Sequence, residues 1–206
     1  ANGDGVGDFE GLVRRLDYLD ALGINTVWLA PFQPSPDRDD GYDISDFYGV
    51  DPRYGSSGDF VEFLQEADKR GIRVILDLVI NHTSDEHAWF RSARRDPESR
   101  YRQWYVWSKK RPRHWNKGMV FPGHQQSTWT YDEQARAYYY HRFYDFQPDL
   151  NNSNPAVRAE IRRMLGFWTQ LGVAGFRVDA VPFILEIPVT RTAKWGHDFS
   201  FLFGLR

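Results

Sequence analysis

The chain has 206 residues, with 26 Lys and Arg against 28 Asp and Glu, which gives a formal net charge of −2. This near balance argues against a nucleic-acid or membrane-surface partner, and no apolar run approaches the roughly 18 residues of a membrane span. The absence of cysteine excludes a disulfide framework and a catalytic thiol, and it fits a cytoplasmic location. Aromatic residues make up 17%, which suits either a large core or a ligand whose apolar faces stack on rings.

Three segments of the chain repeat one pattern, in which an amphipathic helix ends at a glycine and a short apolar strand follows. The repeat predicts right-handed βαβ crossovers and an α/β fold with a parallel sheet covered by helices. Asn154 is expected to cap the third helix, with Pro155 in its first turn. The predicted helix and strand pairs are 9–22 and 24–30, 60–67 and 72–79, and 154–171 and 173–179, with stops at Gly23, Gly71 and Gly172.

The spacing of the glycine stops indicates an insertion after the second strand. About 50 residues separate the first two stops, whereas about 100 separate the second from the third. The insertion is rich in Trp, Tyr, Arg and His and poor in helical periodicity, which predicts a small irregular β subdomain. Its rings are more typical of a small core than of platforms for a sugar, although both interpretations stay open. The rings in question are those of Trp104, Tyr105, Trp107 and Trp115.

Three strands cannot close a (β/α)8 barrel, which needs about 250 residues. We therefore expect the chain to be an internal stretch of a longer enzyme, with a complete doubly wound protein as the alternative. A nucleotide-binding domain is not indicated, because no glycine-rich phosphate loop follows any predicted strand.

The N-terminal segment places oxygen ligands at every second residue. Asn2, Asp4 and Asp8 supply side-chain oxygens and Val6 a carbonyl, which is the alternating spacing with which a loop wraps calcium. The alternative is a Gly/Asp turn in which Asp8 caps the first helix.

Polar residues follow two of the predicted strands, at the edge where α/β proteins bind ligands. Asn81 and His82 come after the second strand, and Arg177 and Asp179 end the third. Because Arg177 and Asp179 are two residues apart, they point to the same face of the strand. An arginine beside a carboxylate keeps it ionised, as a nucleophile requires, but an ordinary ion pair would have the same spacing.

Taken together, these motifs resemble the α-amylase superfamily, glycoside hydrolase family 13. The resemblance runs from Asn2 to about Glu186 and implies a partial (β/α)8 TIM barrel with a small subdomain inserted after the third barrel strand. It implies a first part of the barrel over 1–82, the inserted subdomain B over 83–150 and a continuation of the barrel over 151–206. The motifs that carry it are 41–44 (GYDI), 77–82 (DLVINH), 147–151 (QPDLN) and 175–180 (GFRVDA).

The resemblance makes Asp179 the catalytic nucleophile and Arg177 the group that holds it ionised. The family's general acid is a Glu after the next barrel strand. The only carboxylates after Asp179 are Glu186 and Asp198, and neither follows an apolar strand. We therefore expect the isolated 206 residues neither to hydrolyse nor to transfer glycosides.

The resemblance also implies a subsite for the sugar whose bond is broken. His82 would bind that sugar by hydrogen bonds and Tyr42 by stacking, while Asp39 would bind its hydroxyls. Phe146 and Gln147 would line the same pocket.

A structural calcium ion between barrel and insert is implied by resemblance to the trehalose synthases of the family. Its ligands would be Asn81, Asp149, the carbonyls of Phe183 and Ile184, and Glu186. Oxygen-only ligation suits calcium rather than zinc. Alternatively, Asn81 and Asp149 only hydrogen-bond the insert to the barrel.

Two stretches of the insert, 127–132 and 138–143, resemble trehalose synthases (maltose α-D-glucosyltransferases), as does 179–183. The Gly-Gly-Ser-Ala-Trp run of α-glucosidases is replaced by residues 122–124, Pro-Gly-His. We expect isomerisation of a small α-glucoside such as maltose to trehalose. An α-glucosidase or α-amylase that hydrolyses the bond is the alternative, followed by a non-catalytic binding module. The binding module is disfavoured because Asp179, Arg177, His82 and Tyr42 are all present, which a protein that had lost catalysis would not need.

Overall fold

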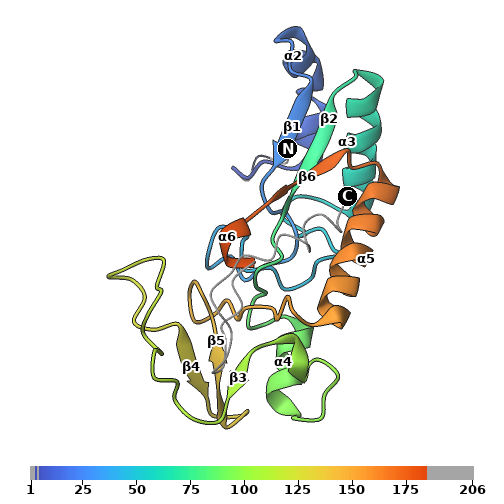
Figure 1. Cartoon of the computed structure of the whole chain (residues 1–206). Helices are drawn as coiled ribbons and strands as arrows, with labels where there is room; N and C mark the ends of the chain where they lie inside the picture. Colours follow the sequence, from blue (N-terminus) through green and yellow to red (C-terminus); the bar gives the residue numbers. More distant parts are fainter. Residues whose placement is uncertain (1–2, 4, 185–206) are drawn as a thin grey trace. The chain divides into compact units, whose positions relative to one another are not determined.

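The computed structural model describes residue 3 and residues 5–184. Their contacts divide the chain into two compact units: a first unit up to Leu78 together with Arg163–Val178, and a second unit of Val79–Arg162 together with the residues from Asp179. The helices are α1 (Phe9–Val13), α2 (Leu16–Ala21), α3 (Ser57–Lys69), α4 (Ala88–Arg95), the 3₁₀ helix η1 (Arg102–Trp104), α5 (Pro155–Leu171) and α6 (Val181–Ile184) (Figure 1). The strands are β1 (Thr26–Leu29), β2 (Arg73–Leu78), β3 (Trp107–Ser108), β4 (Trp129–Asp132), β5 (Ala137–Tyr140) and β6 (Gly175–Val178). The subdomain boundaries predicted at 83 and 150 remain a prediction.

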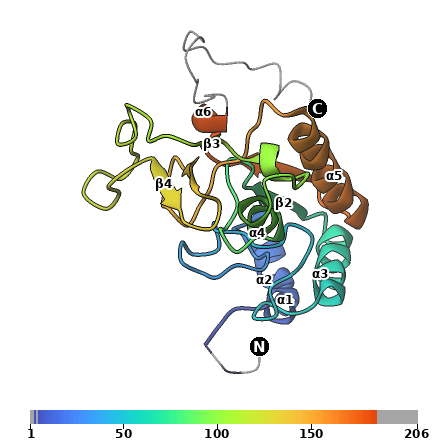
Figure 2. The same ribbon diagram turned by 90° about the horizontal axis from the view of Figure 1, so that it is seen from below.

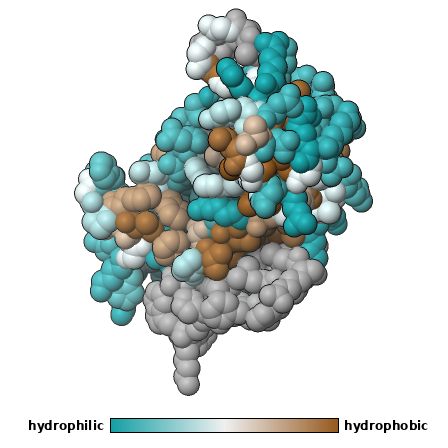
Figure 3. All heavy atoms as spheres, turned by 90° about the horizontal axis from the view of Figure 1, so that it is seen from above, coloured by the Kyte–Doolittle hydropathy of each residue, from teal (hydrophilic) through white to brown (hydrophobic). Residues whose placement is uncertain are grey.

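The first unit contains the predicted parallel sheet, in the order β1-β2-β6. Thr26 pairs with Arg73 at one end of the first strand pair, and Leu78 pairs with Val178 at one end of the second. The central strand β2 is the most buried, as expected for a parallel strand with neighbours on both sides. The outer strands are less buried, and Trp28 on β1 is 49% exposed. Exposed apolar surface is visible as brown areas on the face drawn in Figure 3.

Aromatic side chains from the helices and loops of the first unit form its core. Phe60 of α3 is fully buried, and its ring lies 5.1 Å from that of Phe9, 4.9 Å from that of Phe32 and 5.5 Å from that of Trp168. Figure 2 shows α1 and α3 side by side. The predicted helix 60–67 is confirmed and is longer at both ends, because Ser56 and Asp59 form a capping box at its start.

The first predicted helix is in fact two helices, α1 and α2, so the prediction of one helix over 9–22 is wrong. Arg15 has φ −107° and ψ −1°, and its N–H donates to the carbonyl of Leu12, three residues back, rather than four. The apolar spacing continues across this break, which is why the sequence does not reveal it. The third helix starts as predicted, since Asn154 Oδ1 accepts the N–H of Ala156 at 2.9 Å.

The second unit contains a small antiparallel sheet in the order β3-β5-β4. The fully buried ring of Phe90 on α4 lies 5.0 Å from that of Tyr105 and 5.1 Å from that of Tyr139. Trp104 and Tyr105 are both buried, so their rings belong to a core, as expected. The helix α4 was not expected, because its two turns bury only Phe90 and Ala93 and leave too short a periodic signal. No helix of the described chain is long and apolar enough to span a bilayer.

Candidate active site

In the first unit, the ends of β2 and β6 bring a carboxylate and a guanidinium together. Asp77 and Arg177 are opposite each other in the register of the two parallel strands. Arg177 Nη1 lies 2.8 Å from both carboxylate oxygens of Asp77, and the hydroxyl of Tyr42 donates to Asp77 Oδ2 at 2.8 Å. The Asp77 side chain has no exposed surface. Its buried charge is therefore compensated by a cation and a hydroxyl donor.

Asp77 is a site residue to which the sequence assigned no role. The signal for it was present, since it is an acidic residue inside a buried apolar strand. Arg177 forms an ion pair with Asp77, a partner 100 positions away in the sequence, and its pairing with Asp179 stays a prediction. The Arg177 guanidinium carbon also lies 5.0 Å from the centre of the Trp28 ring, in cation–π geometry.

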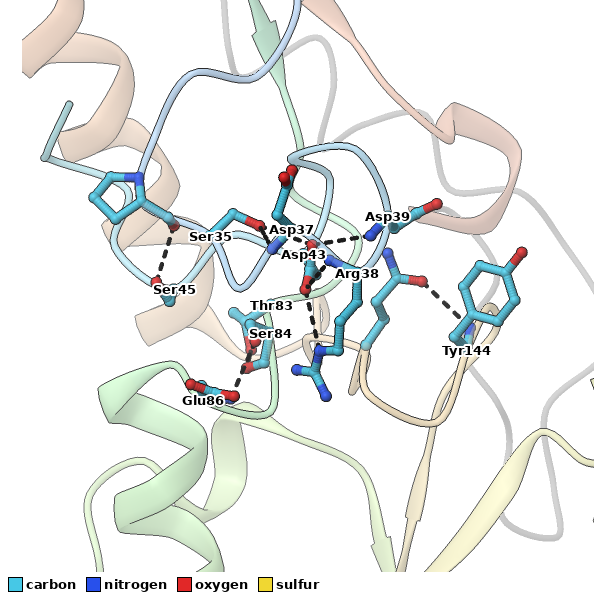
Figure 4. A network of polar contacts seen from close by, with 12 residues as sticks. Ser35, Asp37, Arg38, Asp39, Asp43, Ser45, Thr83, Ser84, Glu86 and Tyr144 are labelled. Carbon is cyan, nitrogen blue, oxygen red and sulfur yellow. Dashed lines mark hydrogen bonds and ion pairs between the residues drawn. The ribbon is translucent and has the colours of Figure 1, made fainter. Parts of the chain in front are cut away.

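The loop after β1, which carries Asp39 and Tyr42, is organised around the buried carboxylate of Asp43. This carboxylate accepts hydrogen bonds from Ser35 Oγ at 2.7 Å and from the backbone N–H groups of Arg38 and Asp39 at 3.3 Å each (Figure 4). In Figure 4 the Asp39 side chain points away from Asp43. Asp43 thus fixes the backbone that presents Asp39, a second role that the sequence did not assign.

Gly41 is required by the geometry of this loop. Its φ is +93°, and an added Cβ would lie 2.8 Å from the carbonyl oxygen of Pro31. We expect Gly41→Ala to lower the free energy of unfolding by about 2 kcal/mol, because alanine at positive φ is strained and meets backbone here. Gly166→Ala is the matched control: this helical glycine has open space, so alanine should leave stability unchanged or raise it. Urea unfolding of both variants tests the prediction, and a Gly41→Ala protein as stable as the parent would contradict it.

In the second unit, two chain segments pair next to the predicted substrate histidine. His82 and Asp149 form an isolated antiparallel bridge, and the N–H of Leu150 donates to the carbonyl of Asn81 at 2.8 Å. His82 and Asn81 are both buried, and the His82 ring lies 5.3 Å from that of Phe143. The pairing holds Asn81 and His82 against Asp149 and Leu150, so residues of the DLVINH and QPDLN motifs lie side by side.

Asp149 is a buried acid that is hydrogen-bonded within the second unit. Its Oδ1 accepts the backbone N–H of Arg142 at 2.9 Å, and the Asn81 side chain also hydrogen-bonds the carboxylate. Burial raises the pKa of Asp149 to about 7, although the hydrogen bonds and the charge of Arg142 lower it in part. Carboxylate and amide oxygens are among the ligands that calcium takes in proteins, so these two residues would supply two of its roughly six to eight oxygen ligands.

The other predicted calcium ligands are placed only in part. Asn2, Asp4 and Glu186 lie outside the described residues. Asp8 Oδ1 accepts the N–H of Gly11 at 2.7 Å, so it caps α1 as the alternative interpretation has it. Within residues 3 and 5–184, no group of three or more His, Cys, Asp or Glu is arranged to hold a metal ion.

The remaining predicted ligands lie on α6. Phe183 packs its ring 5.4 Å from that of Phe143, with the Arg142 guanidinium 4.9 Å from its centre, and Ile184 is buried. Arg142 therefore contacts both residues: its guanidinium lies over the Phe183 ring, and its backbone N–H donates to Asp149.

The two residues predicted to line the sugar pocket differ in exposure. Gln147 is fully buried, and its Oε1 accepts the N–H of Tyr144 at 3.3 Å, so its side chain braces the turn. Phe146 is half-buried and stacks on Tyr144 at 5.1 Å. Directly after Asp179, Ala180 has φ +53°, which is uncommon for a residue other than glycine and is often found at functional sites.

Comparison with known proteins agrees with these motifs. The family model described as alpha amylase, catalytic domain, matches residues 1–200. The chain is 47% identical to trehalose synthase/amylase of Mycobacterium tuberculosis over 206 residues, which is 100% of this chain and 34% of the relative. It is 52% identical to trehalose synthase of Thermus thermophilus over 186 residues, 90% of this chain and 19% of that protein. The crystal structure of Bacillus licheniformis trehalose-6-phosphate hydrolase matches with a TM-score of 0.84 and 42% identity, covering 90% of this chain and 34% of the other.

The chain therefore belongs to the α-amylase catalytic-domain family, glycoside hydrolase family 13. Its fold is part of a (β/α)8 barrel with an inserted subdomain, as the motifs predicted. The chain spans about a third of the length of most of these relatives, and less of the Thermus protein.

Proposed function

We propose that the protein carrying these residues is a retaining enzyme that acts on α-glucosides, with Asp179 as nucleophile. The observation that supports it most is the Asp77–Arg177–Tyr42 network at the ends of β2 and β6. This network fixes the strand end that leads directly into Asp179 and places a fixed cation two residues before it. A nucleophilic carboxylate must stay ionised, and a neighbouring guanidinium favours the ionised form.

In the proposed reaction, the Asp179 carboxylate attacks the anomeric carbon of the glucosyl unit as the bond from that carbon to the leaving oxygen breaks. A protonated carboxylic acid of the family's later barrel strands gives its proton to the leaving oxygen. The covalent glucosyl-enzyme is then attacked by a hydroxyl of the acceptor, or by water, whose proton returns to that acid.

The substrate residues have separate roles in this proposal. Tyr42 stacks its ring on the sugar, and because its hydroxyl is held by Asp77, the ring has a fixed orientation. Asp39 binds hydroxyls from the loop that Asp43 organises, and His82 binds the same sugar unit. Phe146 and Gln147 line the pocket, with Gln147 holding the turn that presents Phe146.

We favour isomerisation of maltose to trehalose over hydrolysis. The identities to trehalose synthases are 46–52%, against 42–45% to oligo-1,6-glucosidases and an α-glucosidase. Incubation of the complete protein with maltose, followed by chromatography of the products, should give trehalose in excess over glucose. Glucose without trehalose would instead support the hydrolase, and recovery of unchanged maltose would support a binding module.

We also propose a structural calcium ion at Asn81 and Asp149, where a buried carboxylate lies beside an amide side chain. Bound calcium would stabilise the folded protein, by about 2.7 kcal/mol at a hundredfold excess over its dissociation constant. A chelator should therefore lower the melting temperature and added calcium should restore it. The Asp149→Asn protein should respond to neither. A chelator response that Asp149→Asn leaves unchanged would move the ion elsewhere.

In the chelated protein, Asp149 should make stability depend on pH. Its folded pKa of about 7 is above its ordinary value of 3.8. Between pH 3.8 and about pH 7, Asp149 is therefore protonated in the folded protein and ionised in the unfolded chain. This contribution to stability is complete below about pH 4 and is lost as the pH rises through about 7. We expect the free energy of unfolding to fall by about 3 kcal/mol more in the parent than in Asp149→Asn over this window, measured in urea. Parallel pH profiles for the two proteins would contradict this prediction.

A further inference from the structure

The second unit contains a polar pocket that takes no part in the roles proposed above. Its volume is about 330 Å³, at the low end of the roughly 300–1,000 Å³ of small-molecule sites, which suits one sugar-sized molecule. The lining comes from the loop 124–127, from Thr130 on β4 and His141 just after β5, and from the turn at Tyr144 and Asp145.

The floor of the pocket is rigid because its polar atoms already have partners inside the protein. His141 is buried, and its ring nitrogens lie 2.9 Å from the carbonyl of Phe143 and 2.9 Å from Thr130 Oγ1. Burial lowers the pKa of His141, so the ring is neutral, with Nδ1 donating to the carbonyl and Nε2 accepting from the hydroxyl. Gln125 accepts two backbone N–H groups, those of Val120 and Phe121, at 2.8 Å each. These groups build the pocket and do not serve a ligand.

The rim, in contrast, offers polar groups that the protein does not use. The side chains of His124, Gln126, Ser127 and Asp145 line the pocket and form no hydrogen bond or ion pair with any residue among 3 and 5–184. Asp145 is exposed, and its backbone carbonyl accepts a hydrogen bond from the hydroxyl of Tyr139 at 2.7 Å. Donors, acceptors and one carboxylate therefore converge on one concave surface.

One wall of the pocket is aromatic. Tyr144 lines it, and the Tyr144 ring stacks on that of Phe121 at 5.2 Å and on that of Phe146 at 5.1 Å. The interplanar angles are 21° and 11°, so the three rings form one stack that fixes the orientation of Tyr144. Because the faces of the Tyr144 ring are covered within this stack, the wall only limits the size of the pocket, and the ligand that matches the rim is a small molecule with several hydroxyls.

We propose that this pocket binds one hexopyranose unit, such as glucose, in addition to the residues that bind the reacting sugar. Asp145 accepts hydrogen bonds from its hydroxyls, Gln126, Ser127 and His124 complete the polar contacts, and Tyr144 bounds the site on one side. Because only one carboxylate is present beside neutral donors, a neutral polyol fits better than a metal ion, which takes several oxygen ligands.

Glucose is titrated calorimetrically into the complete protein carrying Asp179→Asn, which removes turnover. Asp145→Asn is introduced into this background, and Glu133→Gln, at an exposed position of the same unit, is the matched control. We expect Asp145→Asn to weaken one glucose-binding component about tenfold, because a charge-assisted hydrogen bond is lost, and Glu133→Gln to leave it unchanged. Asp145→Asn keeps the size and shape of an exposed side chain, so folding should be unaffected.

Equal glucose binding in the two variants would overturn the proposal. The proposal would also be overturned if glucose produced no heat, while calcium bound the parent protein and did not bind the Asp145→Asn variant. Because binding is measured without the nucleophile, the result is independent of the proposed function. A protein that never turns over maltose but binds glucose through Asp145 would refute only the proposed function. The reverse result would refute only the pocket.

Discussion

The Asp179→Asn protein should lose glycosyl transfer by a factor on the order of 10⁴ or more, while it still binds maltose. Asparagine has the size and shape of aspartate but is a poor nucleophile, so the covalent glucosyl-enzyme cannot form. The substrate contacts proposed for Tyr42, His82 and Asp39 remain in place. We therefore expect kcat to fall and the dissociation constant for maltose to change little, measured by product assay and by calorimetry.

Glu133→Gln is the control for this experiment, since it removes an acidic charge far along the chain from Asp179 and leaves the proposed site intact. Its turnover should equal that of the parent. Maltose turnover by Asp179→Asn within about tenfold of the parent would rule out Asp179 as the nucleophile.

Arg177→Met should damage both activity and stability. Asp77 has no exposed surface, so loss of its cation leaves a buried charge without an ion pair. Loss of such a partner costs about 3–5 kcal/mol when both groups are buried; because the Arg177 side chain is 43% exposed, we expect about 2–3 kcal/mol. Turnover should also fall by about 10³-fold, because the cation beside the proposed nucleophile is gone.

The double variant Arg177→Met, Asp77→Asn separates the two effects. A neutral amide in place of Asp77 removes the unpaired buried charge, so the free energy of unfolding should recover by about 1–2 kcal/mol. Activity should not recover, because no cation is restored. If activity returned together with stability, Arg177 would have only a structural role.

The sheet could be predicted from the sequence because its determinants are local. Each strand follows a helix that ends at a glycine, and Gly23, Gly71 and Gly172 all have positive φ. The break at Arg15 and the short helix α4 could not be predicted. The first interrupts the helix without interrupting the apolar spacing, and the second is too short to show a period.

The site residues also divide into those that the sequence predicts and those that only the fold reveals. The positions of His82, Arg177 and Asp179 at the ends of apolar strands pointed to this edge of the sheet, and the resemblance to the α-amylase family implied their roles. The pairing of Arg177 with Asp77 depends instead on the register of two parallel strands whose residues lie 100 positions apart. Likewise, Asp43 is recognised as the centre of its loop only when the fold brings Ser35 and Asp39 around it. The pocket at Asp145 has no sequence signal, because its rim comes from two separate turns.

The central claim is that the enzyme retains configuration through a covalent bond to Asp179. It is tested most directly by trapping that intermediate with an α-glucosyl fluoride carrying fluorine at C5, followed by proteolysis and mass spectrometry of the labelled peptide. We predict that the complete protein gains the mass of one fluoroglucosyl group and that fragmentation assigns it to Asp179. A label on another carboxylate, or no label in a protein that turns over maltose, would contradict the assignment.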